Sequence, residues 1–500
     1  MESVTLPARG ETLELEIESS GFEGTSIARY QGIVVFVEGA VAGDRVKARV
    51  YKTKKKHIEA KAFEILRPSP DRTAPRCRHF GVCGGCKWQH VTYASQLEFK
   101  RQHVVDAIER IGGFKDVCVL PTLGSEEEYF YRNKLEFSFG TERWITHEEN
   151  IRLKEEERQA IEAANGSGSE ASRALKPEED FVLGFHAPQR YDKIIDIEEC
   201  HLQSVLSVDI LREVKAFALA RRIPAYSAET QTGYFRNLVI REGKRTADVM
   251  VNVVTFDDRP DVMEELSTVL TGKFPAITTI VNNITARRSQ VAVGETEKIY
   301  RGDGKIREEL GRHRFEISAN SFFQTNSRQA ARLYDVAKEY GELKPTDLVY
   351  DLYCGAGSIS LYISDAVRQV VGIELVESSI ANAKKNAEYN GVTNCEFLAG
   401  DLKDLLTKDV EWKRRYADPD VLIIDPPRSG MHPKAVEELG RMQIARVVYV
   451  SCNPATLARD VAMLAPFGYE IEKVQPVDMF PHTYHIECVA KLRLKRSAEQ

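Results

Sequence analysis

The stretch Asp351-Leu-Tyr-Cys-Gly-Ala-Gly-Ser358 decides the fold of this 500-residue chain. An apolar segment precedes it and predicts a buried strand, and the residues after Gly357 are typical of a helix start. Gly355 and Gly357 would let the backbone approach a ligand closely, just before the helix N-terminus. Because the third glycine of the G-x-G-x-x-G pattern is missing, the dinucleotide-binding fingerprint is not met.

From about residue 330 to the C-terminal part of the chain, strands alternate with helices. We expect helices after Gly357 and over 378–389, and strands over 347–352, 370–373, 395–398, 421–424 and 447–450. This order is typical of a doubly wound, Rossmann-like parallel sheet. Ligands of such sheets bind beyond the carboxyl ends of the strands, so the residues that follow each strand are the candidates for function.

Acidic residues follow three of these strands. Glu374 lies seventeen residues past Gly357, where a carboxylate can accept hydrogen bonds from both ribose hydroxyls of an adenosine cofactor. Asp401 follows the third strand and could contact the adenine amine. Asp425 begins Asp425-Pro-Pro-Arg428 after the fourth, and its two prolines predict a rigid loop. The glycines by themselves could belong to tight turns that bind no ligand. The glycine loop, the spaced acidic residues and the strand order together favour a nucleotide-type site.

Cys452 follows the fifth predicted strand, on the same edge of the sheet. Addition of a thiolate to carbon 6 of uracil turns carbon 5 into a nucleophile that can attack a sulfonium methyl group. A base must then remove the proton from carbon 5 so that the thiol can leave. Glu487, at the head of the strand-like run 487–494, is the candidate base, and His482 and His485 are rivals for base or positioning roles.

Nine cysteines without an export signal favour metal binding or catalysis over a disulfide framework. Cys77, Cys83 and Cys86 lie in a Gly-rich loop, and Cys200 is the best candidate for a fourth ligand. Four thiolates fit an iron–sulfur cluster or a zinc ion, and the single CxxC favours the cluster over zinc and over unligated thiols. Four cysteines are interpreted as packed core residues: Cys118, Cys354, Cys395 and Cys488.

The N-terminal region alternates apolar and polar residues with turns between, which predicts a small β-barrel with strands over 33–37, 45–50 and 58–65. Small basic barrels are common oligonucleotide-binding platforms. Residues 44–67 hold nine Lys and Arg against three Asp and Glu, with Lys52 to Lys56 on a loop or strand end. A solvated surface is the plainer interpretation of such a run, and the net charge of −6 does not by itself indicate a nucleic-acid partner.

Three domains are expected: a barrel over 1–67, a central α+β domain over 68–315 with a helix over 93–111, and an α/β domain over 316–500. Strands are expected over 129–147, and an acidic loop insertion, partly helical or disordered, over 148–180. No apolar run is long enough to cross a bilayer, and the N-terminus lacks an apolar signal segment. We therefore expect a cytoplasmic protein.

The chain resembles the RNA uracil-5-methyltransferases, which make 5-methyluridine in ribosomal and transfer RNA. Residues 1–67 also resemble a TRAM domain, a small RNA-binding barrel often fused to such enzymes. Four sequence blocks carry the resemblance to the enzymes: the cysteine cluster, Asp351 to Ser358, Asp425-Pro-Pro-Arg428 with Val448-Tyr-Val-Ser-Cys-Asn453, and His482-Thr-Tyr-His-Ile-Glu487.

This resemblance implies a role for each matching position. Cys452 would be the nucleophile and Glu487 the base that takes the proton from carbon 5. A [4Fe-4S] cluster would be held by Cys77, Cys83, Cys86 and Cys200. S-adenosylmethionine would be bound by Gln324, Tyr353, Ser358, Glu374, Asp401 and Asp425. Some relatives carry Asn at positions 358 and 401, and the 148–180 insert is not a family feature.

Two other functions are weighed against carbon-5 methylation. Enzymes that methylate exocyclic amines use a similar sheet, but an aromatic ring follows their Pro-Pro, where this chain has Arg428. A non-catalytic iron–sulfur protein that binds RNA would not need both Cys452 and Glu487. We expect a monomer acting on structured RNA whose target uridine leaves its stack. By analogy 23S ribosomal RNA is favoured, and transfer RNA is the alternative.

Overall fold

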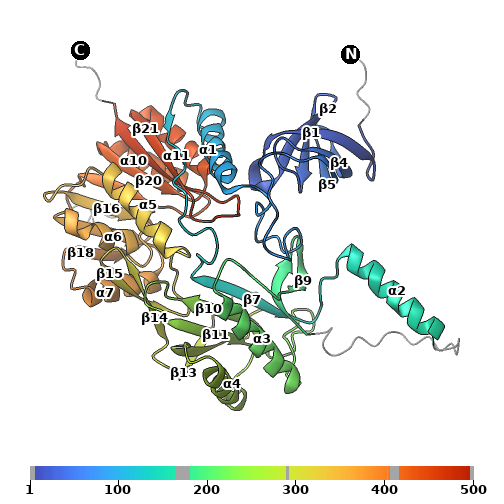
Figure 1. Ribbon diagram of the computed structural model, residues 1–500. Helices are drawn as coiled ribbons and strands as arrows, with labels where there is room; N and C mark the ends of the chain where they lie inside the picture. The colour runs from blue at the N-terminus through green and yellow to red at the C-terminus, as the bar shows by residue number, and fades with distance from the viewer. Residues whose placement is uncertain (1–5, 164–180, 289–291, 403, 406–415, 496–500) are drawn as a thin grey trace.

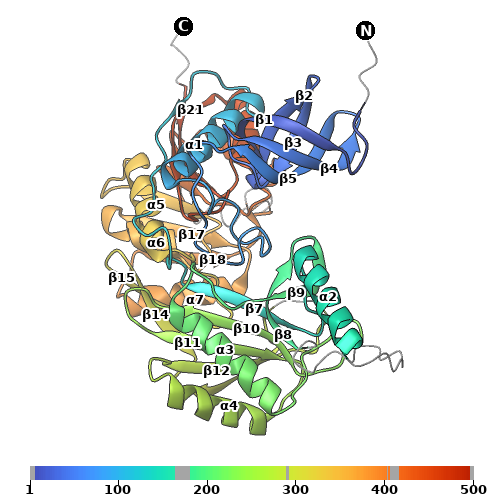
Figure 2. The same ribbon diagram turned by 45° about the vertical axis from the view of Figure 1, so that its right-hand side comes forward.

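The computed structural model describes residues 6–163, 181–288, 292–402, 404–405 and 416–495. The main β-structures of the described chain (Figure 1) are an N-terminal barrel, a central sheet and a C-terminal sheet flanked by helices, and a two-stranded hairpin lies between the last two in sequence. The barrel lies beside helix α1 in both Figure 1 and Figure 2. Within the described residues, no helix combines the length and apolar character that a membrane crossing needs.

The N-terminal barrel is closed, with strand order β1-β2-β3-β5-β4. Its strands are β1 (Thr12–Ser20), β2 (Ser26–Tyr30), β3 (Ile33–Glu38), β4 (Arg45–Lys54) and β5 (His57–Arg67). Val46, Ala48 and Val50 point into its core, and the basic residues between them face out, as the alternating pattern predicts. The predicted barrel is therefore confirmed. Lys55 and Lys56 form the turn between β4 and β5.

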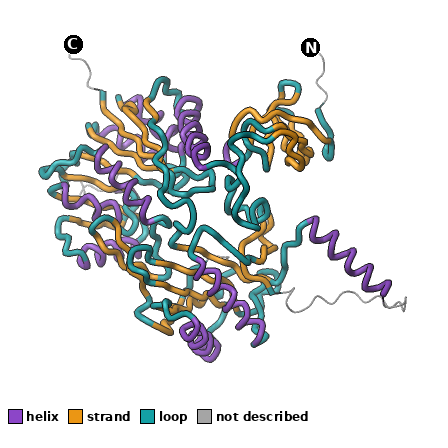
Figure 3. The backbone as a smooth tube through the Cα atoms, viewed as in Figure 1, coloured by secondary structure: helices purple, strands orange, loops and turns teal. Residues whose placement is uncertain are grey.

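The central sheet has seven strands in the order β13-β12-β11-β10-β7-β8-β9. They are β7 (Lys134–Gly140), β8 (Val182–Ala187), β9 (Arg190–Asp196), β10 (Phe235–Glu242), β11 (Val249–Thr255), β12 (Thr279–Ile284) and β13 (Thr296–Arg301). Helices α3 (Val205–Ala220) and α4 (Pro260–Lys273), purple in Figure 3, pack on it through one apolar core. Of the strands expected over 129–147, only β7 forms.

The first part of the predicted insert is helical. Helix α2 (His147–Ala163) extends outward from the central sheet in Figure 1, and residues 164–180 lie outside the described residues. Its exposed face carries alternating charges, including an Arg152–Glu156 pair one turn apart.

The C-terminal sheet has eight strands in the order β18-β17-β16-β19-β20-β22-β21-β6. They are β6 (Cys118–Val119), β16 (Leu348–Leu352), β17 (Gln369–Glu374), β18 (Cys395–Ala399), β19 (Val421–Ile424), β20 (Arg446–Ser451), β21 (Tyr469–Val477) and β22 (Glu487–Leu494). Only β22 is antiparallel to its neighbours. The predicted Rossmann-like sheet is confirmed, and its strand order reverses at β16, beside the glycine loop.

Helices cover both faces of this sheet. A hairpin of β14 (Lys305–Leu310) and β15 (His313–Ser318) packs against α5 in the same core. The helices are α1 (Tyr93–Arg110), α5 (Ser327–Tyr340), α6 (Ser358–Ile363), α7 (Glu377–Tyr389), α10 (Pro433–Met442) and α11 (Pro454–Leu464). Although α1 and β6 precede the central sheet in sequence, β6 is an edge strand of the C-terminal sheet and α1 packs on that sheet, with Val104, Ile108 and Val119 in the shared core.

The cysteines expected in the core divide into two groups. Cys354 and Cys488 are buried and Cys395 is partly buried, as expected. The expectation for Cys118 is wrong, because its side chain is exposed. Cys118 belongs to β6, a two-residue strand at the outer edge of the sheet, where little chain remains to cover it.

Candidate functional site

The glycine loop after β16 turns sharply and approaches the end of β17. Gly355 and Gly357 have positive φ angles of 54° and 77°, and the Gly355 N–H donates to Glu374 Oε2 at 3.1 Å. A Cβ atom at Gly357 would lie 2.9 Å from the Phe397 ring, so no larger residue fits. Tyr353 also has a left-handed φ of 66°, a conformation that costs on the order of 1 kcal/mol for a residue with a side chain.

Tyr334 on α5 connects two of the predicted cofactor residues. Its hydroxyl lies 2.9 Å from Ser358 Oγ and also hydrogen-bonds Gln324. Tyr334 was missed in the sequence because it lies in the apolar stripe of α5, where a tyrosine resembles any other core residue. Its polar end faces the edge of the sheet at which β16 ends.

Four carboxyl groups gather at this edge: Asp351, Glu374, Asp401 and Asp425. Burial raises the pKa of Asp425 to about 7. Burial is also the largest cause of the rise in the pKa of Asp351 to about 7. The charges of Asp425 and Glu374 add to that rise, and a hydrogen bond from Ser360 opposes it. Asp401 adds to the electrostatic field at Tyr353, whose pKa is raised to about 12, chiefly by burial. A site rich in carboxyl groups suits a cationic ligand.

The register of β20 and β22 brings Cys452 and Glu487 together. Ser451, the last residue of β20, pairs with Cys488 across the antiparallel strands, so Cys452, directly after β20, and Glu487, the first residue of β22, lie opposite each other. Burial raises the pKa of Cys452 to about 11, with Glu487 and Asp425 adding to the shift. Glu487 is buried, and this burial raises its pKa well above the usual range.

The loop after Cys452 is fixed to the Asp425-Pro-Pro-Arg428 turn. Asn453 caps α11 by accepting the Ala455 N–H at 3.1 Å, and its side-chain amide donates to the carbonyl of Arg428 at 3.2 Å. The Arg428 charge opposes the rise in pKa of both Cys452 and Glu487. This turn therefore supplies the positive charge that favours a thiolate.

The two histidines near Glu487 lie in the loop 478–486, between β21 and β22. Burial lowers the pKa of each to about 4, so both are neutral at pH 7. His485 Nδ1 lies 2.7 Å from Arg428 Nη2, while His482 is buried against Gln96 and Tyr129.

Helix α1 supports the 478–486 loop through two buried polar side chains that the sequence reading missed. The Gln96 Oε1 atom accepts the His482 N–H at 2.8 Å, and Lys100 Nζ donates to the Phe480 carbonyl at 3.1 Å. Both side chains are fully buried, on the same face of α1 as Val104. The sequence did contain an indication of this: Gln96 and Lys100 are four residues apart and in line with Val104, and polar residues in line with an apolar stripe of a helix indicate that they are buried against polar partners.

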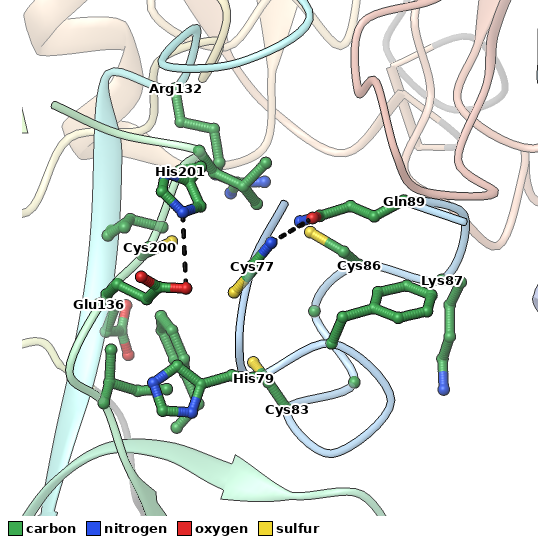
Figure 4. A pocket seen from close by; sticks show the side chains of 18 of the residues that line it. Cys77, His79, Cys83, Cys86, Lys87, Gln89, Arg132, Glu136, Cys200 and His201 are labelled. Carbon is green, nitrogen blue, oxygen red and sulfur yellow. Dashed lines mark hydrogen bonds and ion pairs between the residues drawn. The ribbon is translucent and has the colours of Figure 1, made fainter. Parts of the chain in front are cut away.

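The four predicted cluster cysteines line one cavity of about 640 Å³ (Figure 4). Cys77, Cys83 and Cys86 lie on residues 77–86, here called the cysteine loop, and Cys200 reaches the cavity from the segment after β9. All four are free thiols with pKa values raised chiefly by burial, to about 11 for Cys83 and about 12 for Cys86. Within the described ranges, no three potential ligands converge as a single ion requires.

Family models match both ends of the chain. The model of tRNA (Uracil-5-)-methyltransferase matches residues 279–495, which include the Asp425, Cys452 and Glu487 segments. The TRAM domain model matches residues 8–63, which form the barrel.

Whole-length relatives and one solved structure agree with these matches. An uncharacterized RNA methyltransferase of Chlorobaculum tepidum is 42% identical over 485 residues, covering 96% of each chain. One of Porphyromonas gingivalis is 40% identical over 481 residues, covering 96% of this chain and 99% of its own. The Pyrococcus abyssi tRNA (uracil-54, C5)-methyltransferase, solved with S-adenosyl-L-homocysteine, is 31% identical, with a TM-score of 0.71 over 96% of this chain and 100% of its own.

Proposed function

We infer the function of this chain from its family: it belongs to the S-adenosylmethionine-dependent RNA (uracil-5-)-methyltransferases with an N-terminal TRAM domain. We propose that it makes 5-methyluridine in 23S ribosomal RNA through a covalent intermediate on Cys452. Family membership sets aside exocyclic-amine methylation and a non-catalytic binding role. The observation that carries the mechanism is the placement of Cys452 opposite Glu487, beside the carboxyl-rich edge of the sheet.

The reaction follows from these two side chains. The Cys452 thiolate adds to carbon 6 of the uracil, and the enolate that forms attacks the methyl group of S-adenosylmethionine, releasing S-adenosylhomocysteine. Glu487 then takes the proton from carbon 5, the electrons of that bond restore the 5,6 double bond, and the pair of the C6–S bond returns to Cys452. Arg428 favours the thiolate at the first step because its positive charge lowers the pKa of Cys452.

The pKa shifts support Glu487 over the histidines as the base. A carboxylate with a raised pKa binds a proton strongly once it is ionised, whereas imidazoles with a pKa of about 4 bind protons weakly at neutral pH. His482 also uses its Nδ1 atom in a contact with Gln96. The positive sulfonium of the methyl donor would favour the ionised form of Glu487.

The methyl donor would lie along the carboxyl ends of β16 to β19. Glu374 would accept hydrogen bonds from the ribose hydroxyls and Asp401 one from the adenine amine, because Glu374 ends β17 and Asp401 follows β18. Tyr353 and Asp425 would border the methionine part of the donor. Gln324 and Ser358, which share Tyr334 as a hydrogen-bond partner, would complete the proposed set.

The cysteine cavity fits an iron–sulfur cluster better than a zinc ion. Structural zinc sites with four thiolates commonly draw them from two CxxC pairs, and this chain has a single CxxC here, Cys83 to Cys86. The four thiols instead surround a cavity, as the ligands of a cluster do (Figure 4). A bound cluster would be held by Cys77, Cys83, Cys86 and Cys200, and would supply positive iron that keeps these thiols deprotonated.

Metal analysis tests this part of the proposal. Protein purified without oxygen should contain iron and acid-labile sulfide, and Cys200→Ser should lose most of both. Cys118→Ser is the matched control, because Cys118 is exposed and lies outside the cavity. Zinc without sulfide, or an equal loss in both variants, would refute the cluster.

The two RNA candidates have different support. The combination of a barrel with a four-cysteine cavity favours 23S ribosomal RNA by analogy. The Pyrococcus abyssi relative acts on transfer RNA, which makes transfer RNA the second candidate. In either case the uridine must leave its stack to reach both Cys452 and the methyl donor.

A methyl-transfer assay tests the function. Wild type, Cys452→Ala and Glu487→Gln would each be given labelled S-adenosylmethionine with unmodified 23S ribosomal RNA and, separately, transfer RNA. We expect 5-methyluridine from wild type alone, and an RNA–protein adduct stable to denaturation from Glu487→Gln. Full activity of Cys452→Ala would overturn the covalent mechanism, and label in transfer RNA alone would overturn the ribosomal assignment.

A further inference from the structure

The two flanks of the cysteine loop are linked to one residue of the 478–486 loop, His482, one flank directly and the other through Tyr129. The backbone N–H groups of Lys87 and Trp88, directly after the loop, each donate to the His482 carbonyl at 2.9 Å. Directly before the loop, the Arg76 guanidinium lies 5.1 Å from the centre of the Tyr129 ring. That ring in turn stacks on the His482 imidazole with centroids 4.2 Å apart and planes 30° apart.

His482 is held in a conformation that it would not adopt freely. Its φ angle is 65°, in the left-handed region, and its side chain is only 3% exposed. Gln96 contacts it twice, accepting its backbone N–H and donating to its ring nitrogen Nδ1, 3.2 Å away. Left-handed backbone at a residue with a side chain persists where the surroundings impose it. Contacts from the residues directly after the cysteine loop and from α1 therefore set the path of the chain five residues before Glu487.

An RNA-stacking platform is the other use that Arg76 and Tyr129 suggest, because nucleic-acid sites combine arginine with aromatic rings. The contacts do not favour it. The Tyr129 ring is already stacked on His482, and the Arg76 guanidinium lies over both this ring and that of Phe130. Although Arg76 itself is exposed, the Tyr129 ring on which a base would stack is already engaged by both His482 and Arg76.

We propose that His482 is a positioning residue for Glu487, and that the cysteine loop acts on the base through it, so that a filled cysteine cavity fixes the base in place. The inference rests on the proposed function. Through the contact with His482, the four cysteines affect the last step of the reaction, in which Glu487 takes the proton from carbon 5 and the C6–S bond to Cys452 breaks. A displaced base would leave methyl transfer possible and slow this elimination.

Substitution of Tyr129 tests the contact. Tyr129→Leu removes the ring that lies between Arg76 and His482, whereas Tyr129→Phe keeps it. For Tyr129→Leu we expect kcat to fall about tenfold or more with little change in KM, and the methylated RNA–protein adduct to accumulate. Tyr129→Phe should restore wild-type turnover. A variant that loses activity without accumulating adduct, or that raises KM alone, would overturn the positioning role.

Hydrogen exchange of the full chain tests the link to the cavity without relying on activity. Cys200→Ser alters the cavity from outside the cysteine loop, and Cys118→Ser is again the control. We expect amide exchange in 478–487 to rise about tenfold or more in Cys200→Ser alone, with the central-sheet segment 235–255 unchanged. Unchanged exchange in 478–487, or an equal rise in 235–255, would overturn the inference. Wild type that makes no 5-methyluridine would instead refute the proposed function.

Discussion

The Lys100 ammonium and the Asp478 carboxylate form an ion pair 2.5 Å long, with neither side chain exposed to solvent. The pair connects α1 to the first residue of the 478–486 loop, and Tyr93 and the Phe480 N–H add hydrogen bonds to the same carboxylate. Burial lowers the pKa of Lys100, and the charge of Asp478 opposes this shift. A buried charge is stable here only while its partner is present.

Lys100→Met should therefore destabilise the protein by about 3 kcal/mol or more, because Asp478 would be left charged and buried. The measurement is the thermal unfolding midpoint at pH 7. Lys47→Met is the matched control, since it breaks the exposed Lys47–Glu64 pair of 3.0 Å and should cost no more than about 1 kcal/mol. Equal shifts in the two variants would contradict a special role for the buried pair.

Glu374→Ala should weaken binding of S-adenosylhomocysteine about tenfold or more. The lost carboxylate both accepts the Gly355 N–H and is the proposed partner of the ribose hydroxyls. Titration calorimetry gives the affinity directly. Glu388→Ala on the exposed face of α7 is the control and should bind as wild type does. Unaltered affinity in Glu374→Ala would remove this residue from the proposed site.

The pKa of Asp351, raised to about 7, predicts a pH dependence of stability. The folded state holds a proton there that the unfolded state releases near its ordinary pKa of about 4, so the free energy of unfolding falls as pH rises from about 4 to about 7. The slope from this group is at most about 1.4 kcal/mol per pH unit.

Asp351→Asn should flatten the profile, because the amide cannot ionise. Unfolding midpoints would be compared at pH 5, 6, 7 and 8, with the exposed Asp418→Asn as control. If wild type and Asp351→Asn lose stability in parallel over this range, the proton is not held at Asp351.

Neutralising Lys54, Lys55 and Lys56 should weaken RNA binding and flatten its salt dependence. Lys54 shares Glu59 with Lys52, at 3.5 Å and 3.3 Å, so part of the charge is already compensated within the barrel. The plot of the logarithm of the RNA-binding constant against the logarithm of the salt concentration should become less steep by up to about 2, since each lost phosphate contact reduces its steepness by about 0.7–0.9. The triple Gln variant would be compared with Lys384→Gln/Lys385→Gln on α7. An unchanged slope would place the RNA elsewhere.

Sequence by itself determined the local structure and the kind of chemistry. Alternating polarity predicted β4 and β5 of the barrel, and apolar runs with turn residues predicted β16 to β20 and the helices α6 and α7, but not α10. Because parallel strands present their carboxyl ends at one edge, the order of elements alone placed Glu374, Asp425 and Cys452 at a common edge. Sequence also placed Glu487 at the start of β22, where the structure has it.

Tertiary structure alone decided which distant residues meet. Only the antiparallel pairing of β20 with β22 sets Cys452 opposite Glu487, and a shift of one residue would turn Glu487 to the other face. The Lys100–Asp478 pair joins residues far apart in sequence, and the edge position of β6 left Cys118 exposed. Polarity patterns record that a face is buried but not what covers it, because the covering residues come from other parts of the chain.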